Sequence, residues 1–144
     1  MSKEPKFVKL TSPLVPQVQQ FLKTHARESL SFGQLLAYCV HPNTTAFVLL
    51  NSEDSTIVGF IGGQGDESQG KIDILCVHSE YRQLGWGEQL VVKFMSTHAL
   101  ANYALEVRQS NKKAQRLYKR LGFSEKDVMP AFYRNEDALV MHLG

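Results

Sequence analysis

The stretch Lys71–Met95, KIDILCVHSEYRQLGWGEQLVVKFM, decides how this chain folds. Its first part, residues 72–77, is a short apolar run typical of a strand. Two glycines, Gly85 and Gly87, come after a polar turn, and residues 87–98 then carry apolar side chains at helical spacing. The stretch therefore predicts a strand, a glycine loop and a helix in direct succession.

Such a junction is suited to binding an anion. The first turn of a helix leaves backbone N–H groups without partners, and the helix dipole makes that end positive. Gly85 and Gly87 permit positive φ angles and allow the backbone to approach a ligand closely. Arg82 adds a planar fork of donors that matches a phosphate group. From these residues alone we predict a cradle for a phosphate or pyrophosphate.

Two better-known phosphate loops do not fit this sequence. The dinucleotide fingerprint requires a third glycine at the position of Leu90. Gly65 and Gly70-Lys71 approximate a nucleotide P-loop, but Ile72 replaces the required Ser or Thr and the match precedes a strand. We therefore interpret residues 65–70 as a hairpin turn.

The apolar spacing elsewhere predicts further strands at 7–10, 46–51, 57–63, 103–107, 123–125 and 138–142, and helices at 32–40 and 111–121. Another helix should begin at Pro13, with Ser12 as its N-cap. We predict one α/β domain over residues 1–144, with a mixed, twisted sheet of about seven strands flanked by helices. The strands on either side of the glycine-loop helix should be its adjacent parallel pair.

The composition excludes several classes of function. The chain has 144 residues, of which 43% are hydrophobic and 21% charged, as in ordinary globular proteins. A formal charge of +2 is too small to indicate binding to nucleic acid or to a membrane surface. Cys39 and Cys76 have no metal-binding or CxxC spacing, and the N-terminus lacks a signal-peptide pattern. We expect a cytoplasmic protein without a metal site.

Three polar residues could carry chemistry or only structure. Glu106 lies on the polar face of a strand, where it could act as a general base or simply form an ion pair with Arg108. Tyr118 lies in the apolar stripe of a helix and could be a core tyrosine with a satisfied hydroxyl. Asn111 could equally be a helix cap. Residue spacing alone leaves these alternatives open and favours the structural ones.

Three segments together resemble one enzyme family. Arg82-x-x-Gly85-x-Gly87 resembles the acetyl-CoA loop of the GCN5-related N-acetyltransferases (GNAT), and LEVRQSNKKAQRLYKRLGF, residues 105–123, resembles the second signature of that family. The run 133–141 further resembles its RimI-like branch, which acetylates protein N-termini, including the N-terminal alanine of a ribosomal protein. The resemblance covers residues 46–142 and is weak before them.

The resemblance implies a role for each matching residue. Backbone groups of Leu75, Cys76 and Val77 would contact the acetyl and pantetheine part of acetyl-CoA, and Asn111 would bind its arm. The pyrophosphate would lie on Arg82, Gln83, Leu84, Gly85, Trp86, Gly87 and Glu88. Glu106 would be the general base, Tyr118 the general acid, and Tyr133 a contact of the acceptor.

The chain departs from the family pattern at two places. Trp86 stands where the family usually has Ile or Leu, and residues 27–32 do not match the substrate loop of RimI. We therefore keep two alternatives to a protein N-terminus as the acceptor. The first is a small amine such as a polyamine or an antibiotic, and the second is a non-catalytic module that binds acyl-CoA. A monomer or weak dimer is expected.

Overall fold

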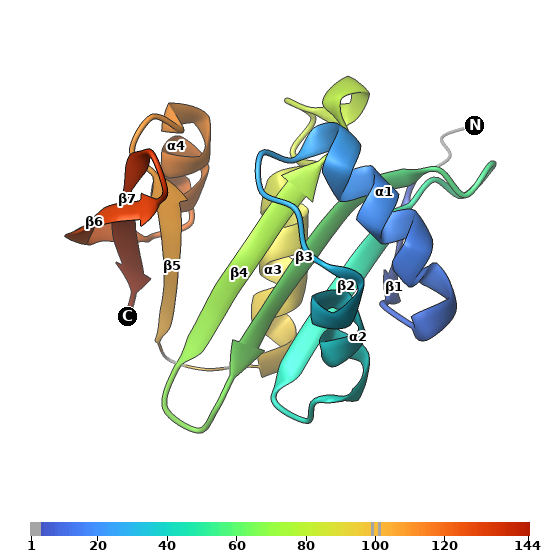
Figure 1. The fold of residues 1–144 in the computed structure, drawn as a ribbon, viewed down its shortest axis with the longest axis horizontal. Helices are drawn as coiled ribbons and strands as arrows, with labels where there is room; N and C mark the ends of the chain where they lie inside the picture. Colours follow the sequence, from blue (N-terminus) through green and yellow to red (C-terminus); the bar gives the residue numbers. More distant parts are fainter. Residues whose placement is uncertain (1–3, 99, 101) are drawn as a thin grey trace.

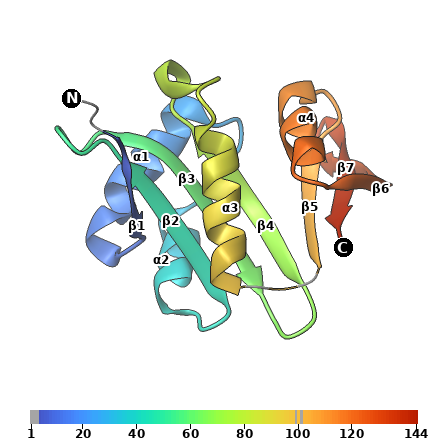
Figure 2. The same ribbon diagram turned by 180° about the vertical axis from the view of Figure 1, so that it is seen from behind.

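The computed structural model describes residues 4–98, 100 and 102–144. In this part of the chain, seven strands form one sheet in the order β1-β2-β3-β4-β5-β7-β6 (Figures 1 and 2). The strands are β1 Lys6–Lys9, β2 Thr44–Leu50, β3 Ile57–Gly65, β4 Gly70–Val77, β5 Tyr103–Arg108, β6 Ser124–Tyr133 and β7 Glu136–Leu143. The helices are η1 Ser12–Leu14, α1 Val15–His25, α2 Phe32–Val40, η2 Ser79–Tyr81, α3 Trp86–His98 and α4 Lys112–Arg120. The predicted fold class and its mixed, seven-stranded sheet are confirmed.

Helices cover both faces of the sheet. Helices α1 and α2 lie on one face, as Figure 1 shows, and α3 lies on the other, as Figure 2 shows from behind. Strand β2 is an almost continuous apolar run because its side chains alternate between two buried faces. Phe47 and Leu49 pack in the core under α3, whereas Ala46 and Val48 pack in the core under α1 and α2.

The predicted parallel pair is confirmed and is short. Strand β4 pairs with β5 only from Gly70↔Tyr103 to Ile72↔Leu105. Beyond Ile72 the two strands diverge, as Figure 1 shows, with α4 following β5. Strand β3 continues to pair with β4 as far as Val77 on the opposite side. One edge of β4 is therefore unpaired over its last five residues, which precede the glycine loop.

Two predictions near the ends of the chain were wrong in detail. Ser12 does not cap a helix that starts at Pro13: a 3-10 turn comes first, and α1 begins at Val15 without a side-chain cap. Pro16 at the start of α1 explains this, because proline lacks an N–H and fits the first turn of a helix. The last strand pair exists, but β6 is ten residues long instead of three. It is an exposed edge strand, so no alternating apolar pattern marks it.

The hairpin interpretation of residues 65–70 is confirmed. The N–H of Asp66 donates to the carbonyl of Gln69, and the Asp66 carboxylate accepts from the amides of Ser68 and Gln69. Asp66 thus closes the turn with its own side chain. In the same described ranges, every helix is too short or too polar to cross a membrane.

Candidate functional site

The glycine loop presents a row of backbone amides. Helix α3 begins at Trp86, one residue earlier than predicted, and its first turn is bonded by Gln89 N–H to Gly85 O. Gln83 and Gly85 have φ angles of 64° and 90°, which turn the chain sharply before the helix. Within the described residues, the amides of 83–88 have no protein acceptor. The loop can therefore offer several N–H groups to one anion.

Side chains around this loop are arranged to leave the amides free. The guanidinium of Arg82 donates from Nε to Val77 O at 3.0 Å and from an Nη to His25 O at 2.9 Å. Arg82 thus fastens the loop to the protein instead of pointing freely at a ligand. Glu88, whose charge would repel a phosphate, is neutralised by Arg120 at 2.6 Å. Leu84 is exposed, and Trp86 packs against the core beneath the loop.

The unpaired edge of β4 carries a second set of backbone groups. His78 N–H donates to Val58 O, so the polar groups of residue 78 face β3. Since successive residues of a strand point their N–H and C=O groups to opposite sides, those of Leu75 and Val77 face the open edge. Those of Cys76 face β3, and its side chain is buried. Leu75, Cys76 and Val77 were predicted to contact the ligand through their backbone, and the structure leaves this possible for Leu75 and Val77.

A bulge lies where β4 and β5 begin to diverge. The register between β3 and β4 shifts between Gly62 and Gly63, which leaves Asp73 as an extra residue in β4. The Asp73 carboxylate accepts the Tyr38 hydroxyl at 2.7 Å and the Gln64 amide at 3.2 Å. Burial first, and then the charge of Asp73, raise the pKa of Tyr38. These bonds fix the shape of β4 at this point.

Glu106 lies in β5 immediately after the paired section of the strands. Its carboxylate contacts the ammonium group of Lys71 at 3.0 Å, and its side chain is only 15% exposed. The ion pair with Arg108 that we considered as the structural alternative is therefore absent. Lys71 takes that place because the parallel register sets it opposite Ala104, two residues before Glu106 on β5.

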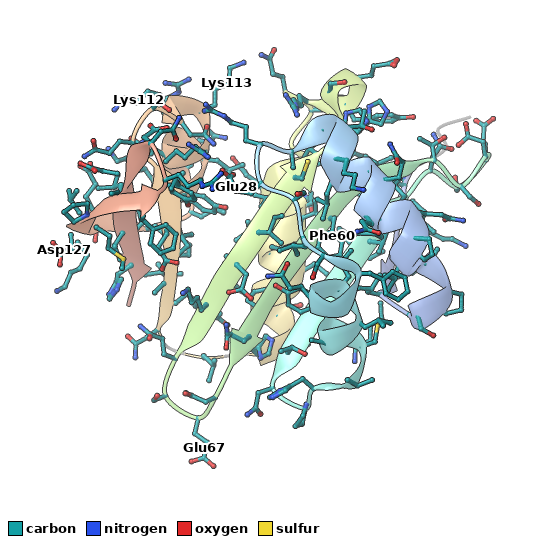
Figure 3. The ribbon with its side chains drawn as sticks, in the orientation of Figure 1. Glu28, Phe60, Glu67, Lys112, Lys113 and Asp127 are labelled. Carbon is teal, nitrogen blue, oxygen red and sulfur yellow. The ribbon has the colours of Figure 1, made fainter. Side chains whose placement is uncertain are left out.

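Arg108 joins three distant segments. Its guanidinium contacts Glu28 in the α1–α2 connection and Glu136 at the start of β7, with 3.2 Å to the latter. It also lies 4.6 Å from the centre of the Tyr133 ring. Figure 3 shows Glu28 between the α1–α2 connection and the part of the molecule formed by β5 to β7. The side chain of Arg108 is largely buried, so these contacts hold the three segments together.

Two tyrosines lie close to this cluster. Tyr118 is 5% exposed and stacks edge-on against Phe123, as a core tyrosine would. Its hydroxyl has no hydrogen-bond partner among the described residues. The hydroxyl of Tyr118 also keeps some contact with solvent. Among the described residues, the only fully buried side-chain N or O atom without a hydrogen-bond partner is His98 Nε2. Burial, and then Tyr133, raise the pKa of Tyr118, so its hydroxyl stays protonated.

Tyr133 connects the two groups electrostatically. Burial, followed by the charges of Glu28 and Glu106, raises the pKa of Tyr133 to about 12. Tyr133 is thus close enough to Glu106 and to Tyr118 for their charges to act on one another. Sequence analysis had assigned all three to one site from the family resemblance.

A pocket of about 520 Å³ opens beside Tyr133 and Arg108. It lies between the α1–α2 connection and the tip of the β6–β7 hairpin, and it is lined by Arg27, Glu28, Arg108, Phe132, Tyr133, Arg134 and Asn135. Of these residues, sequence analysis had named only Tyr133 as a contact. The others were missed because they come from three segments that no local pattern connects.

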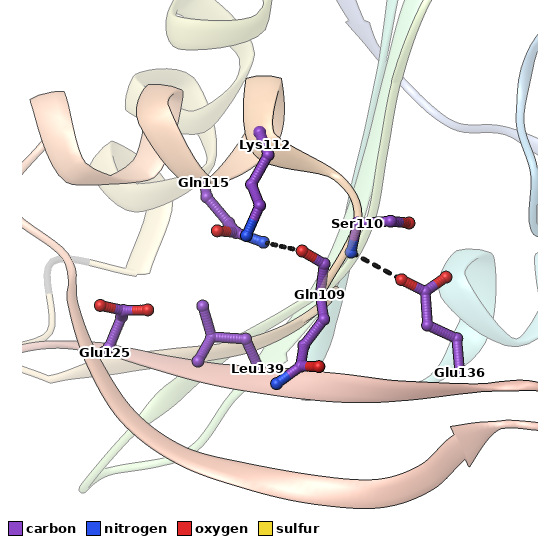
Figure 4. A pocket seen from close by; sticks show the side chains of 7 residues that line it. All are labelled: Gln109, Ser110, Lys112, Gln115, Glu125, Glu136 and Leu139. Atoms are coloured by element: carbon purple, nitrogen blue, oxygen red, sulfur yellow. Dashed lines mark hydrogen bonds between the residues drawn. The ribbon is translucent and has the colours of Figure 1, made fainter.

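Asn111 caps α4. Its side-chain oxygen accepts from Ala114 N–H at 3.2 Å, which confirms the capping interpretation. A second pocket, of about 430 Å³, lies beside this cap, and Figure 4 shows Gln115 and Glu136 fixing its walls. Gln115 donates to Gln109 O at 2.9 Å, and Glu136 accepts from Ser110 N–H at 2.6 Å. Two pairs of lining residues are therefore bonded to each other across this pocket.

No cluster of three or more metal-ligating side chains occurs in the described ranges 4–98, 100 and 102–144. The arrangement is instead a row of free amides at a helix start, an unpaired strand edge, and a carboxylate with two tyrosines. These features can bind an anionic ligand along the diverging strands and can move protons beside it.

Comparison with known proteins places the chain in a family. The acetyltransferase (GNAT) family model matches residues 15–123. An uncharacterised N-acetyltransferase of Methanocaldococcus jannaschii is 39% identical over 93 residues, which cover 61% of this chain and 60% of that protein. A putative [ribosomal protein bS18]-alanine N-acetyltransferase of Bacillus subtilis is 31% identical over 104 residues, 69% of each. The chain thus spans between 60% and 69% of the length of these two curated relatives.

A solved structure confirms the same architecture. The ribosomal-protein-S18-alanine N-acetyltransferase of Escherichia coli matches with a TM-score of 0.84 and 22% identity, over 96% of this chain and 92% of that one. The two folds therefore agree over nearly the whole of both chains. The chain therefore belongs to the acetyltransferase (GNAT) family.

Proposed function

We propose that this protein transfers the acetyl group of acetyl-CoA to the N-terminal α-amine of a protein. The observation that carries the proposal is the divergence of β4 from β5 directly before the glycine loop. It leaves the N–H and C=O of Leu75 and the N–H of Val77 without a strand partner, a few residues before the free amides of residues 83–88, while the Val77 carbonyl accepts from Arg82. A pantetheine chain with its amides and a pyrophosphate matches that sequence of backbone donors and acceptors.

The residues present fit acetyl-CoA. The amides of 83–88 and the positive start of α3 would hold the pyrophosphate, with Arg82 fixing the loop and Arg120 cancelling the charge of Glu88. Bound acetyl-CoA supplies an acetyl group on a thioester, whose carbon accepts an amine and whose thiolate departs. The side-chain NH2 group of Asn111 is available for the cofactor arm, because only the side-chain oxygen caps the helix.

Proton transfer falls to Glu106 and Tyr118. Only a neutral amine attacks, and an α-amine with a reference pKa of ~8 is neutral far more often at pH 7 than a lysine at ~10.4. Glu106, held by Lys71, takes the proton of the amine directly or through water. Tyr118, whose hydroxyl stays protonated, donates to the departing thiolate. A backbone N–H at the open edge, near Val77, stabilises the developing negative oxygen.

The pocket of about 520 Å³ supports a peptide acceptor. A small polyamine would need an acidic enclosure, whereas three arginines and one glutamate line this pocket. The pocket includes Tyr133 and Arg108, the latter two residues after Glu106 on the same face of β5, and lies between two surface segments. A chain that enters with its N-terminus first could leave between them. The RimI-like branch suggests alanine as the first acceptor residue to test.

The test uses the full chain, acetyl-CoA and a pair of peptides. Both peptides begin with alanine and contain one internal lysine, and one of them has a blocked N-terminus. We expect mass spectrometry to find one acetyl group on the free α-amine, with an equal amount of free CoA thiol released. The blocked peptide should remain unmodified. Acetylation of the lysine in both peptides, or cofactor binding without any turnover, would contradict the proposal.

A further inference from the structure

The acceptor pocket has an excess of positive charge that the proposed chemistry does not use. Arg27 and Glu28 lie on its α1–α2 side, Arg134 lies on the β6–β7 side, and Arg108 lies between them. Arg27 and Arg134 thus come to the pocket from different segments. Such a charge pattern selects acceptors by the residues that follow their N-terminus.

The carboxylates near the pocket are already paired. Glu28 and Glu136 both bond to Arg108, and Glu136 also accepts from the amide of Ser110. These bonds, from Ser110 first and then from Arg108, lower the pKa of Glu136. Glu106 is bonded to Lys71. A cationic side chain of an acceptor would have to displace one of these partners to find a carboxylate.

Arg27 and Arg134 are in the opposite situation. Both side chains are exposed, and neither has a carboxylate partner within the described residues. Arg27 makes one long hydrogen bond, 3.5 Å to the hydroxyl of Ser110. Arg134 occupies the hairpin tip with a φ of 33°. A guanidinium offers a planar fork that fits a carboxylate, so two such sites remain available at the pocket opening.

We infer that the acceptor is a protein N-terminus followed within its first few residues by acidic side chains, which pair with Arg27 and Arg134. This inference rests on the proposed acetyltransferase function and names its substrate class. The positive surroundings also favour the neutral form of the incoming α-amine, because a nearby like charge disfavours the ammonium form. The same charges disfavour polyamines and peptides rich in lysine or arginine.

The experiment compares three peptides that share an N-terminal alanine and length. They continue with Asp-Glu-Asp, with the carboxamide counterpart Asn-Gln-Asn, or with Lys-Arg-Lys. We expect kcat/KM for the acidic peptide to exceed that of the neutral peptide about three- to tenfold, the effect of two surface ion pairs. The basic peptide should be the poorest substrate. Raising NaCl from about 0.05 M to about 0.5 M should shrink these differences.

Variants assign the preference to the two arginines. The double substitution Arg27→Gln and Arg134→Gln should reduce the ratio of acidic to neutral kcat/KM towards one. Lys9→Gln with Lys23→Gln removes the same net charge at exposed positions that do not line the pocket. This control should keep the ratio of the unmodified protein. Equal losses of the ratio in both double variants would overturn the inference, since long-range charge alone would then explain the preference.

Binding of fluorescently labelled forms of the same peptides separates this inference from the proposed function. Turnover of all three peptides, with a ratio of acidic to neutral kcat/KM near one, overturns the inference and leaves the acetyltransferase function intact. Binding of the acidic peptide that depends on Arg27 and Arg134, without turnover of any peptide, supports the pocket and contradicts the enzyme. Absence of both binding preference and turnover overturns the inference as well.

Discussion

In the proposed function, the glycine loop and the acceptor pocket would bind their ligands by different means. The loop would use backbone amides from six consecutive positions, 83–88, with few side chains involved. The pocket would use side chains from three segments, held together by Arg108 across 80 residues to Glu28 and 28 residues to Glu136. The donor side should therefore tolerate most side-chain changes that keep the backbone, whereas the acceptor side should depend on individual charges.

Tyr118→Phe should give the largest effect and belongs to neither region. The ring keeps its packing against Phe123, so the fold and both binding sites should persist. Loss of a general acid slows the chemical step by roughly 10²–10⁴-fold. Single-turnover rates with saturating acetyl-CoA and peptide measure this step. A rate equal to that of the unmodified protein would make Tyr118 a core residue only.

Glu106→Gln should give the next largest effect, with a dependence on pH. A missing base should cost roughly 10²-fold near pH 7, where the acceptor amine is mainly protonated. The defect should shrink towards about pH 9, because the amine with a reference pKa of ~8 then loses its proton unaided. The measurement is the rate ratio of unmodified protein to variant over this range.

The outcome of the Glu106 experiment separates three roles. A ratio near one at every pH would reduce Glu106 to the ion-pair partner of Lys71. A large ratio that does not vary with pH would indicate a role in placing the acceptor. Lys71→Met in parallel shows how much of the effect comes from loss of the pair alone.

Gly87→Asp should weaken the donor side without changing the acceptor side. A Cβ at this position would lie 2.8 Å from Cδ1 of Leu117, a side-chain atom that can move aside. Gly87→Asn shares that contact and lacks the charge, so it is the matched control. A like charge at the helix start should weaken acetyl-CoA binding by roughly 5- to 30-fold relative to Asn. Equal affinities of the two variants by calorimetry would place the pyrophosphate elsewhere.

Arg108→Gln should give the smallest effect and should fall on the acceptor side alone. Loss of the contacts with Glu28 and Glu136 releases the two walls of the pocket. We expect KM for the peptide to rise about fivefold, the effect of partly exposed ion pairs, with unchanged acetyl-CoA affinity. Arg108→Lys keeps the charge without the planar fork and should recover only part of the loss. A change in acetyl-CoA affinity would show that the two regions are not separable here.

The sequence predicted the donor side well because its signals are local. The apolar run 72–77, Gly85 and the following helix lie within one short stretch, and each follows from spacing or backbone conformation. The parallel pairing of β4 and β5 followed from the same order of elements. The cap at Asn111 was also predictable from the sequence.

The acceptor side escaped prediction because its contacts are distant in sequence. Residue spacing favoured an ion pair of Glu106 with Arg108, its neighbour two positions away, yet Lys71 and Glu28 are the actual partners. The register of the parallel pair, which sequence did not provide, was the only signal for Lys71. Strand β6 was missed over most of its length because its side chains face solvent on both sides.

Arg82 gives the molecule a property that neither ligand site has alone. Its guanidinium donates to the last carbonyl of β4 and to the last carbonyl of helix α1, and Arg27 and Glu28 follow two and three residues after that helix end. Any coupling between the two substrates through this contact would then depend on one arginine.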